Sequence, residues 1–214
     1  MAWGDIPDWS YDSVKSLMEA LKAVEPSTYN HCLRVGEYSR KLAAAMGMNE
    51  FEQKVAEFAG ILHDIGKIGI ERNILLKPGK LDAHELDVIQ SHSIISEQII
   101  QPFTTHPFFK QILPAVRGHH ERIDGEGYPD KLMGDEIPLI ARVILIVDTY
   151  DAMSVDRVYR KGLSDEIIYA ELRRCSGTQF EPELVRIFLA VHASWSKQKA
   201  NVETFRHVTT RKVA

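Results

Sequence analysis

Apolar residues recur along most of the chain at the three- and four-residue spacing of an amphipathic helix. In the first such segment, Trp9, Val14 and Leu21 fall on one face. Pro26 interrupts the pattern, because proline cannot continue a helix interior. The spacing therefore predicts a leading helix that buries one face and ends before Pro26.

Two further helices follow with identifiable ends. The second begins near Ser27 or Thr28 and stops near Gly47. Asn49 is a favourable N-cap residue for a third helix. We expect that helix to end at His63-Asp64, because glycines interrupt the pattern soon afterwards.

The middle of the chain predicts two more helices, each ended or opened by a proline. Asp82 can cap a helix that continues to Ile100 before Pro102 stops it. Pro107 opens another that extends to His119. Turn-forming residues then occupy positions 124–129, so we expect a loop there.

An apolar run from Ile137 to Val147 is compatible with a buried strand or a buried helix. We favour the helix, because Pro138 suits a helix start and no other segment offers a strand to pair with. Ser164 and Pro182 begin two last helices, and the tail is polar. The pattern predicts an all-α, single-domain helical bundle. We expect a lead helix over 1–26, the domain over 27–195 and a tail over 196–214.

The amino-acid composition and net charge argue against several classes of protein. With 214 residues, 44% of them hydrophobic and 26% charged, the chain can bury a core. A net charge of −4 argues against binding to DNA or RNA polymers. Cys32 and Cys175 form no CxxC pair, which favours a reducing cytoplasm over a disulfide framework. Neither a secretory signal nor an apolar run long enough for a membrane span is evident, so we expect no membrane association.

The histidine content raises the question of a metal site, because the chain has nine histidines and only two cysteines. Five of them, with two aspartates, stand at helix ends or on helix faces where they could gather around metal ions. Imidazole and carboxylate ligands suit zinc, iron, manganese, nickel or cobalt. A bridging carboxylate would allow two cations, a pair suited to hydrolysis of a phosphate ester. The candidate ligands are His31, His63, Asp64, His92, His119, His120 and Asp148.

Several blocks of sequence carry a specific resemblance. They are His63-Asp64-Ile65-Gly66-Lys67-Ile68-Gly69-Ile70, Lys77-Pro78-Gly79-Lys80-Leu81, the stretch 119–129 (HHERIDGEGYP), Asp148-Thr149-Tyr150-Asp151-Ala152-Met153-Ser154, and Asp156-Arg157-Val158-Tyr159-Arg160. In order and spacing the chain resembles the HD-GYP family, a branch of the HD superfamily of metal-dependent phosphohydrolases. The resemblance extends from Ser27 to Ala190.

The resemblance implies a helical bacterial phosphodiesterase that linearises cyclic di-GMP to pGpG, often continuing to GMP. The nucleophile would be a hydroxide bridging the two metals. The resemblance places His31, His63, Asp64 and Asp148 around the first metal. It places Asp64 as a bridge, with His92, His119 and His120, around the second.

The same resemblance suggests substrate contacts. Lys67 would contact the scissile phosphate and offset charge in the transition state. Tyr128 would border the substrate pocket, while Arg157 and Arg160 would hold the phosphates of the dinucleotide. Asp151 lies one helical turn beyond Asp148, so it would contact substrate or support the ligands.

One departure sets the expected number of metals. Members of the family with three metals carry a glutamate one turn before the first histidine ligand, where this chain has Ser27. Glu25, two residues earlier, would point elsewhere. We therefore expect two divalent cations, iron or manganese by preference and nickel or zinc as alternatives. The step from pGpG to GMP is left open.

Two other functions are compatible with these residues. One keeps the chemistry and changes the substrate to 3′,3′-cyclic GMP-AMP. The other is a non-catalytic effector that binds cyclic di-GMP and signals to a protein partner, although this chain keeps every expected ligand. A homodimer or a signalling protein partner is compatible with either. We expect His84, His106, His192 and His207 to have ordinary structural roles.

Overall fold

The computed structural model describes residues 6–156 and 161–195, and these residues form helices and loops without a β-strand. The all-α prediction is confirmed. The apolar run after Pro138 is a helix rather than a strand. The α-helices are α1 (Asp8–Val24), α2 (Pro26–Ala45), α3 (Glu50–Leu62), α4 (Arg72–Leu75), α5 (Ala83–Gln90), α6 (His92–Ile100), α7 (Pro107–Arg117), α8 (Leu139–Ser154), α9 (Asp165–Arg174) and α10 (Pro182–Trp195), with a 3₁₀ turn, η1, at Ile65–Gly69.

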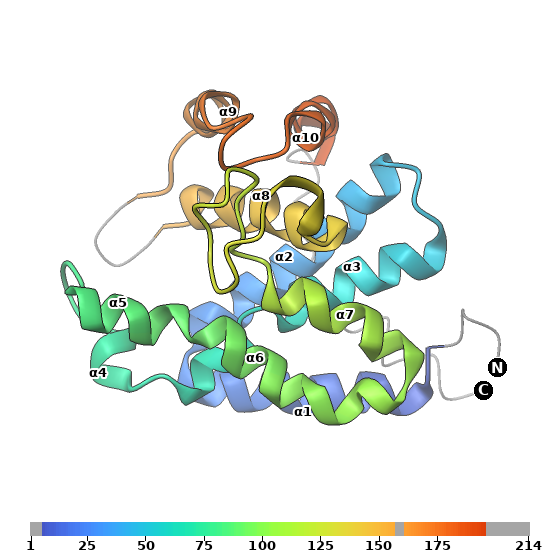
Figure 1. Cartoon of the computed structure of the whole chain (residues 1–214), viewed down its shortest axis with the longest axis vertical. Helices are drawn as coiled ribbons and strands as arrows, with labels where there is room; N and C mark the ends of the chain where they lie inside the picture. The colour runs from blue at the N-terminus through green and yellow to red at the C-terminus, as the bar shows by residue number, and fades with distance from the viewer. Residues whose placement is uncertain (1–5, 157–160, 196–214) are drawn as a thin grey trace.

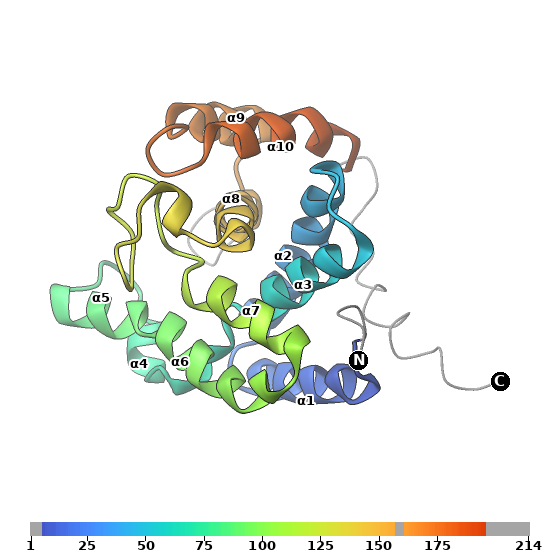
Figure 2. The ribbon, with the colours of Figure 1, turned by 45° about the vertical axis from the view of Figure 1, so that its right-hand side comes forward.

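The helices surround a central group that includes α2, α3 and α8 (Figure 1). In both views α1 lies at one end of the molecule and the α9–α10 pair at the other (Figure 2). Helices α6 and α7 lie nearer to α1 than to the α9–α10 pair in both views. The middle of the bundle is therefore where segments far apart in sequence meet.

The helix starts follow from local chemistry. Asn49 caps α3 as expected, since its side chain accepts the N–H of Glu52 and the Glu52 carboxylate accepts the N–H of Asn49. Glu25 caps α2, because its carboxylate accepts the N–H groups of Ser27 and Thr28. These caps satisfy backbone donors that a helix start leaves unpaired.

The single helix predicted from Asp82 to Ile100 is wrong in one respect, because it is divided at Ser91. The Ser91 hydroxyl donates to the carbonyl of Val88 at 2.7 Å, and Nδ1 of His92 bonds the carbonyl of Ile89 at 2.7 Å. These side chains thus bond backbone carbonyls at the point where α5 and α6 meet. The break falls immediately before a candidate ligand.

One hydrophobic core unites the chain from α1 to α10. Val14, Met18 and Leu21 of α1 are buried in the same cluster as Ile144 of α8 and Phe188 of α10. The boundary drawn at residue 26 stays a prediction, although the lead helix shares this core. Cys32 and Cys175 are free and buried. No helix in the described part of the chain combines the length and the apolarity needed to cross a membrane.

Helices α2 and α3 approach one another at a pair of glycines. A Cβ atom on Gly60 would lie 2.9 Å from Cα of Gly36 and 3.0 Å from the carbonyl oxygen of Val35. Both neighbours are backbone atoms, so the contact cannot relax by a change of rotamer. The missing side chains let α2 and α3 come together, and these helices carry or lead into three of the candidate ligands.

Gly60→Ala should therefore lower the free energy of unfolding by about 1–3 kcal/mol, the usual cost of overpacking a core. Alanine favours a helix over glycine by about 1 kcal/mol, so a loss would report the steric clash. Urea unfolding of the metal-free protein measures it.

Gly69→Ala is the matched control, because its new Cβ would meet only the side-chain carbons of Ile95, at 3.1 and 3.3 Å. Equal midpoints and slopes for Gly60→Ala and the wild type would contradict the packing argument.

Candidate metal centre

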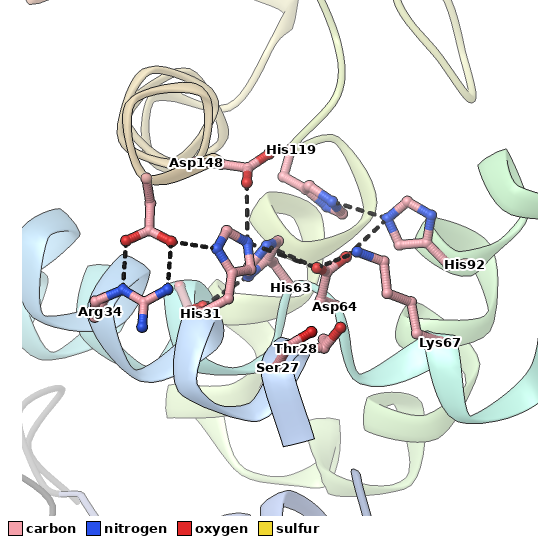
Figure 3. A network of polar contacts seen from close by, with 12 residues as sticks. Ser27, Thr28, His31, Arg34, His63, Asp64, Lys67, His92, His119 and Asp148 are labelled. Atoms are coloured by element: carbon pink, nitrogen blue, oxygen red, sulfur yellow. Dashed lines mark hydrogen bonds and ion pairs between the residues drawn. The ribbon is translucent and has the colours of Figure 1, made fainter. Parts of the chain in front are cut away.

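The structure gathers all seven predicted ligands from five parts of the chain. They lie on α2 (His31), at the turn after α3 (His63 and Asp64), at the start of α6 (His92), after α7 (His119 and His120) and on α8 (Asp148). Figure 3 shows most of them facing one another across the centre of the bundle. His63, Asp64, His92 and His119 are at most 1% exposed.

The ligand atoms fall into two groups that share one carboxylate. His31, His63 and Asp64 form the first group, and Asp64 with His92, His119 and His120 forms the second. Within each group the candidate ligand atoms lie within 4.8 Å of one another. Asp148 borders the first group, with its Oδ1 atom 3.0 Å from Nε2 of His31.

Asp64 presents one oxygen to each group. Its Oδ1 atom lies 3.2 Å from Nε2 of His92. Its Oδ2 atom lies 3.4 Å from Nε2 of His63 and 3.7 Å from Nε2 of His31. A carboxylate placed in this way can bridge two cations.

Three of the histidines are anchored in the same way. Each bonds through Nδ1 to the backbone carbonyl three residues earlier, so Nδ1 carries the proton and Nε2 turns inward with a free lone pair. The bonds join His63 to Gly60, His92 to Ile89 and His119 to Val116, each at 2.7 Å.

This arrangement leaves acceptors facing acceptors, an arrangement suited to binding a cation. The Nε2 atoms of His92 and His119 lie 3.1 Å apart, although both Nδ1 protons are engaged elsewhere. Nε2 of His63 and Oδ1 of Asp64 are buried without a hydrogen-bond partner among the described residues. Buried polar atoms are costly unless they are paired. The donor set therefore fits divalent cations.

Burial and neighbouring charges shift the pKa of His31 in one direction and those of His119 and His120 in the other. Burial lowers the pKa of His119 well below its usual range and lowers the pKa of His120 to about 3. Burial also disfavours the charged form of His31, but its bonds to Asp148 and Asp151 raise its pKa from 6.5 to about 9. Without metal, His119 and His120 are thus neutral, whereas a proton occupies His31. Cation binding at His31 requires release of that proton.

A family model described as an HD domain matches residues 15–184, which is most of the chain. The chain belongs to the HD domain family. The family resemblance seen in the motifs is confirmed, and the matched range includes the adjacent His63 and Asp64.

The curated proteins that this chain resembles are named as phosphodiesterases of cyclic dinucleotides. The chain is 36% identical over 198 residues to 3′3′-cGAMP-specific phosphodiesterase 2 of Vibrio cholerae, covering 89% of this chain and 38% of the relative. It is 35% identical over 182 residues to a cyclic di-GMP phosphodiesterase of Thermotoga maritima, covering 85% of this chain and 49% of the relative. The chain thus spans half or less of these relatives.

A solved structure shares the fold. A cyclic GMP-AMP specific phosphodiesterase of V. cholerae superposes with a TM-score of 0.68 at 17% identity, covering 94% of this chain and 53% of that one. At this identity the likeness supports the fold alone. It agrees with the helical HD-domain bundle expected from the motifs.

The turn that carries the His-Asp pair is fastened to α6 by Ser96. The Ser96 hydroxyl accepts the N–H of Gly66 at 2.8 Å and donates to the carbonyl of His63 at 2.8 Å. Gly66 permits this contact, because a Cβ there would lie 2.1 Å from the carbonyl oxygen of His92. The link fixes the spacing between the shared carboxylate of Asp64 and the second group.

The loop that follows His120 covers the second group. The ring of Tyr128 stacks on His120, with centroids 4.7 Å apart and planes inclined by 28°. Glu121 is 1% exposed, and its carboxylate accepts the N–H groups of Asp130 at 2.6 Å and Leu132 at 3.1 Å. These bonds hold the loop so that Tyr128 stays beside the site.

Lys67 points at the shared carboxylate. Its Nζ atom donates to Oδ2 of Asp64 at 2.6 Å, and the side chain stays 23% exposed. Burial would raise the pKa of Asp64, but Lys67 and the surrounding histidines hold it well below its usual range. The Lys67 ammonium would therefore be in reach of a phosphoryl group bound at the Asp64 carboxylate.

Asp151 lies in a supporting position. It is 2% exposed and bonded to Nδ1 of His31 at 2.6 Å, as well as to Arg34. The expected contact between Asp151 and substrate stays a prediction. Sequence reasoning missed Arg34, although its position one turn after His31 on the same helix is a usable signal. Arg157 and Arg160 lie outside the described residues.

The remaining histidines have other contacts. His106 caps α7, with Nδ1 accepting the N–H of Phe108 at 3.3 Å. Nδ1 of His192 lies 2.7 Å from the hydroxyl of Tyr169. His84 is exposed on α5, and His207 lies outside the described residues. The first two thus have the ordinary structural roles expected of them.

Ser96→Ala should weaken the centre, because it leaves the Gly66 N–H and the His63 carbonyl without the hydroxyl. We expect a loss of about 1–3 kcal/mol in the free energy of unfolding. We also expect metal affinity to fall by about tenfold or more. Urea unfolding of the metal-free protein and metal titration measure the two effects.

Ser93→Ala is the control, since Ser93 is equally buried on α6 but its hydroxyl bonds the carbonyl of Gln90, at the end of α5, rather than the turn after α3. If Ser93→Ala reduced metal affinity as much as Ser96→Ala, the link to the His-Asp turn would not be the cause.

Proposed function

We propose that this chain is a metal-dependent phosphodiesterase that hydrolyses cyclic di-GMP to linear pGpG. The observation that carries the proposal is the bridging position of Asp64, with one oxygen facing each of two histidine groups. The curated relatives, named as cyclic di-GMP and cyclic GMP-AMP phosphodiesterases, support the substrate class.

The donor set supports two divalent cations, with iron or manganese preferred and nickel or zinc as alternatives. Hard carboxylate and borderline imidazole ligands suit this series of metals. The Glu25 carboxylate is bonded to the N–H groups of Ser27 and Thr28 at the start of α2, where it serves as a cap. That use of Glu25 is consistent with two metals rather than three.

When bound, two divalent cations would activate a water at neutral pH and stabilise charge on a phosphoryl group. The protein residues supply the remaining contributions. The Lys67 ammonium, held at Asp64, would neutralise developing negative charge on the phosphoryl oxygens. Tyr128 would flank the bound base or ribose beside His120. Arg157, Arg160 and Asp151 are proposed as further substrate contacts.

A second candidate keeps the chemistry and changes the substrate to 3′,3′-cyclic GMP-AMP. The 36% identity to a phosphodiesterase named for that dinucleotide favours it. A non-catalytic effector that binds cyclic di-GMP is a third candidate. Its partner would be a signalling protein or a second copy of the chain, and the cytoplasm is the expected location for all three.

Elemental analysis and turnover on one anaerobically purified sample separate these functions. We expect two metal ions per chain and faster release of pGpG from cyclic di-GMP than of linear product from 3′,3′-cyclic GMP-AMP. Adding pGpG as a substrate tests the second cleavage. The reverse preference would assign the cyclic GMP-AMP activity. Binding without turnover of the iron- or manganese-loaded protein would assign the effector, and three metals per chain would contradict the inferred stoichiometry.

Two substitutions separate metal binding from chemistry. Asp64→Ala should abolish both metal content and turnover, because it removes the ligand shared by the two groups. Lys67→Ala should keep the metal and lower kcat by about 100-fold or more, since its charge acts in the transition state. Lys22→Ala, at an exposed pair on α1, is the control. Hydrolysis by purified Asp64→Ala protein would rule out the mechanism.

A further inference from the structure

Among the candidate ligands that the structure anchors through Nδ1, His31 is held differently from the others. His63, His92 and His119 each bond the backbone carbonyl three residues earlier, so their own chain segment fixes the ring. Nδ1 of His31 instead bonds Oδ2 of Asp151, on another helix, at 2.6 Å. The orientation of His31 therefore depends on a tertiary contact between α2 and α8.

Arg34 completes that contact. Its Nε atom donates to Oδ1 of Asp151 at 2.6 Å and its Nη2 atom donates to Oδ2 at 2.9 Å. This two-point bond fixes the plane of the carboxylate. The contacts thus lead from Arg34 through Asp151 to His31 and on to Asp148, and Figure 3 labels Arg34, His31 and Asp148 among them.

The contact lies apart from the second group. Asp151 is 2% exposed, so it depends on protein partners rather than on water. Arg34 and His31 are one turn apart on α2 and grip the carboxylate together. The anchors of His92 and His119 are carbonyls of Ile89 and Val116, and neither belongs to α2 or α8.

We propose that Arg34 is a positioning residue that controls occupancy of the first metal group without controlling the second. It holds Asp151 so that Nε2 of His31 faces Asp64 and Asp148. The inference rests on the proposed function only in taking the two groups as sites for divalent cations.

The test compares Arg34→Met, which removes the guanidinium but keeps much of the aliphatic stem, with Arg34→Lys and the wild type. After identical manganese loading and desalting, we expect two ions per chain in the wild type and one in Arg34→Met. Manganese affinity of the first group should fall by about 10- to 100-fold, the usual effect of removing a residue that supports a ligand. Arg34→Lys should recover part of it.

Arg40→Met is the matched control. Arg40 lies on the same helix, and its guanidinium is 3.7 Å from Glu57, a residue outside the ligand set. Asp151→Asn is a second variant, which preserves side-chain size and should lower occupancy of the same group. Thermal unfolding of each metal-free protein shows whether it has folded.

Nitrogen NMR of the histidines in metal-free protein supplies a readout that a loss of stability alone would not produce. Arg34→Met should change the signals of His31 and leave those of His92 and His119 in place. The proposal is overturned if folded Arg34→Met keeps two ions at wild-type affinity with unchanged His31 signals. It is also overturned if both groups lose metal equally. Neither result depends on turnover, so failure of the proposed hydrolysis would be seen separately.

Discussion

The structure depends on one buried carboxylate that has to be satisfied from two sides. Asp64 is 1% exposed, and an isolated ionised carboxylate at such a depth would be strongly disfavoured. Lys67 bonds one oxygen, while the other faces His92 without a hydrogen bond among the described residues. Cations between the two histidine groups would compensate this charge. The helices that surround Asp64 are arranged so that imidazole nitrogens reach it from both directions.

The precision of that arrangement comes from small residues and buried polar links. Gly36 and Gly60 let α2 and α3 approach, and Gly66 lets the turn after α3 lie against α6. Ser96 then joins the backbone of the turn to α6 through one hydroxyl. A side chain at any of these glycines would collide with backbone atoms. The absence of side chains there therefore helps to set the positions of the ligands.

The two metal groups differ in how they are supported. The histidines of the second group are held largely by carbonyls of their own segments, and Tyr128 stacks on one face of His120. In the first group His63 is held in the same way by Gly60, whereas His31 relies on side chains, from Arg34 through Asp151. A change between α2 and α8 would therefore act on one group before the other. This asymmetry would give the proposed metal centre a physical basis for unequal affinities at its two groups.

The sequence by itself determined the helical class and most helix ends, and it named the candidate ligands that the structure brings together. Helix formation and helix ends depend on local signals, namely the apolar periodicity, Asn49 and the prolines. They can therefore be predicted without knowing which segments meet in the fold. The prediction from sequence erred at Ser91, where the structure divides a segment whose apolar periodicity is continuous and side chains bond the Val88 and Ile89 carbonyls. Only the tertiary structure decided which oxygen of Asp64 faces which group, and that Arg34 supports His31. Those facts depend on distances between helices, which cannot be inferred from the spacing of residues along the chain.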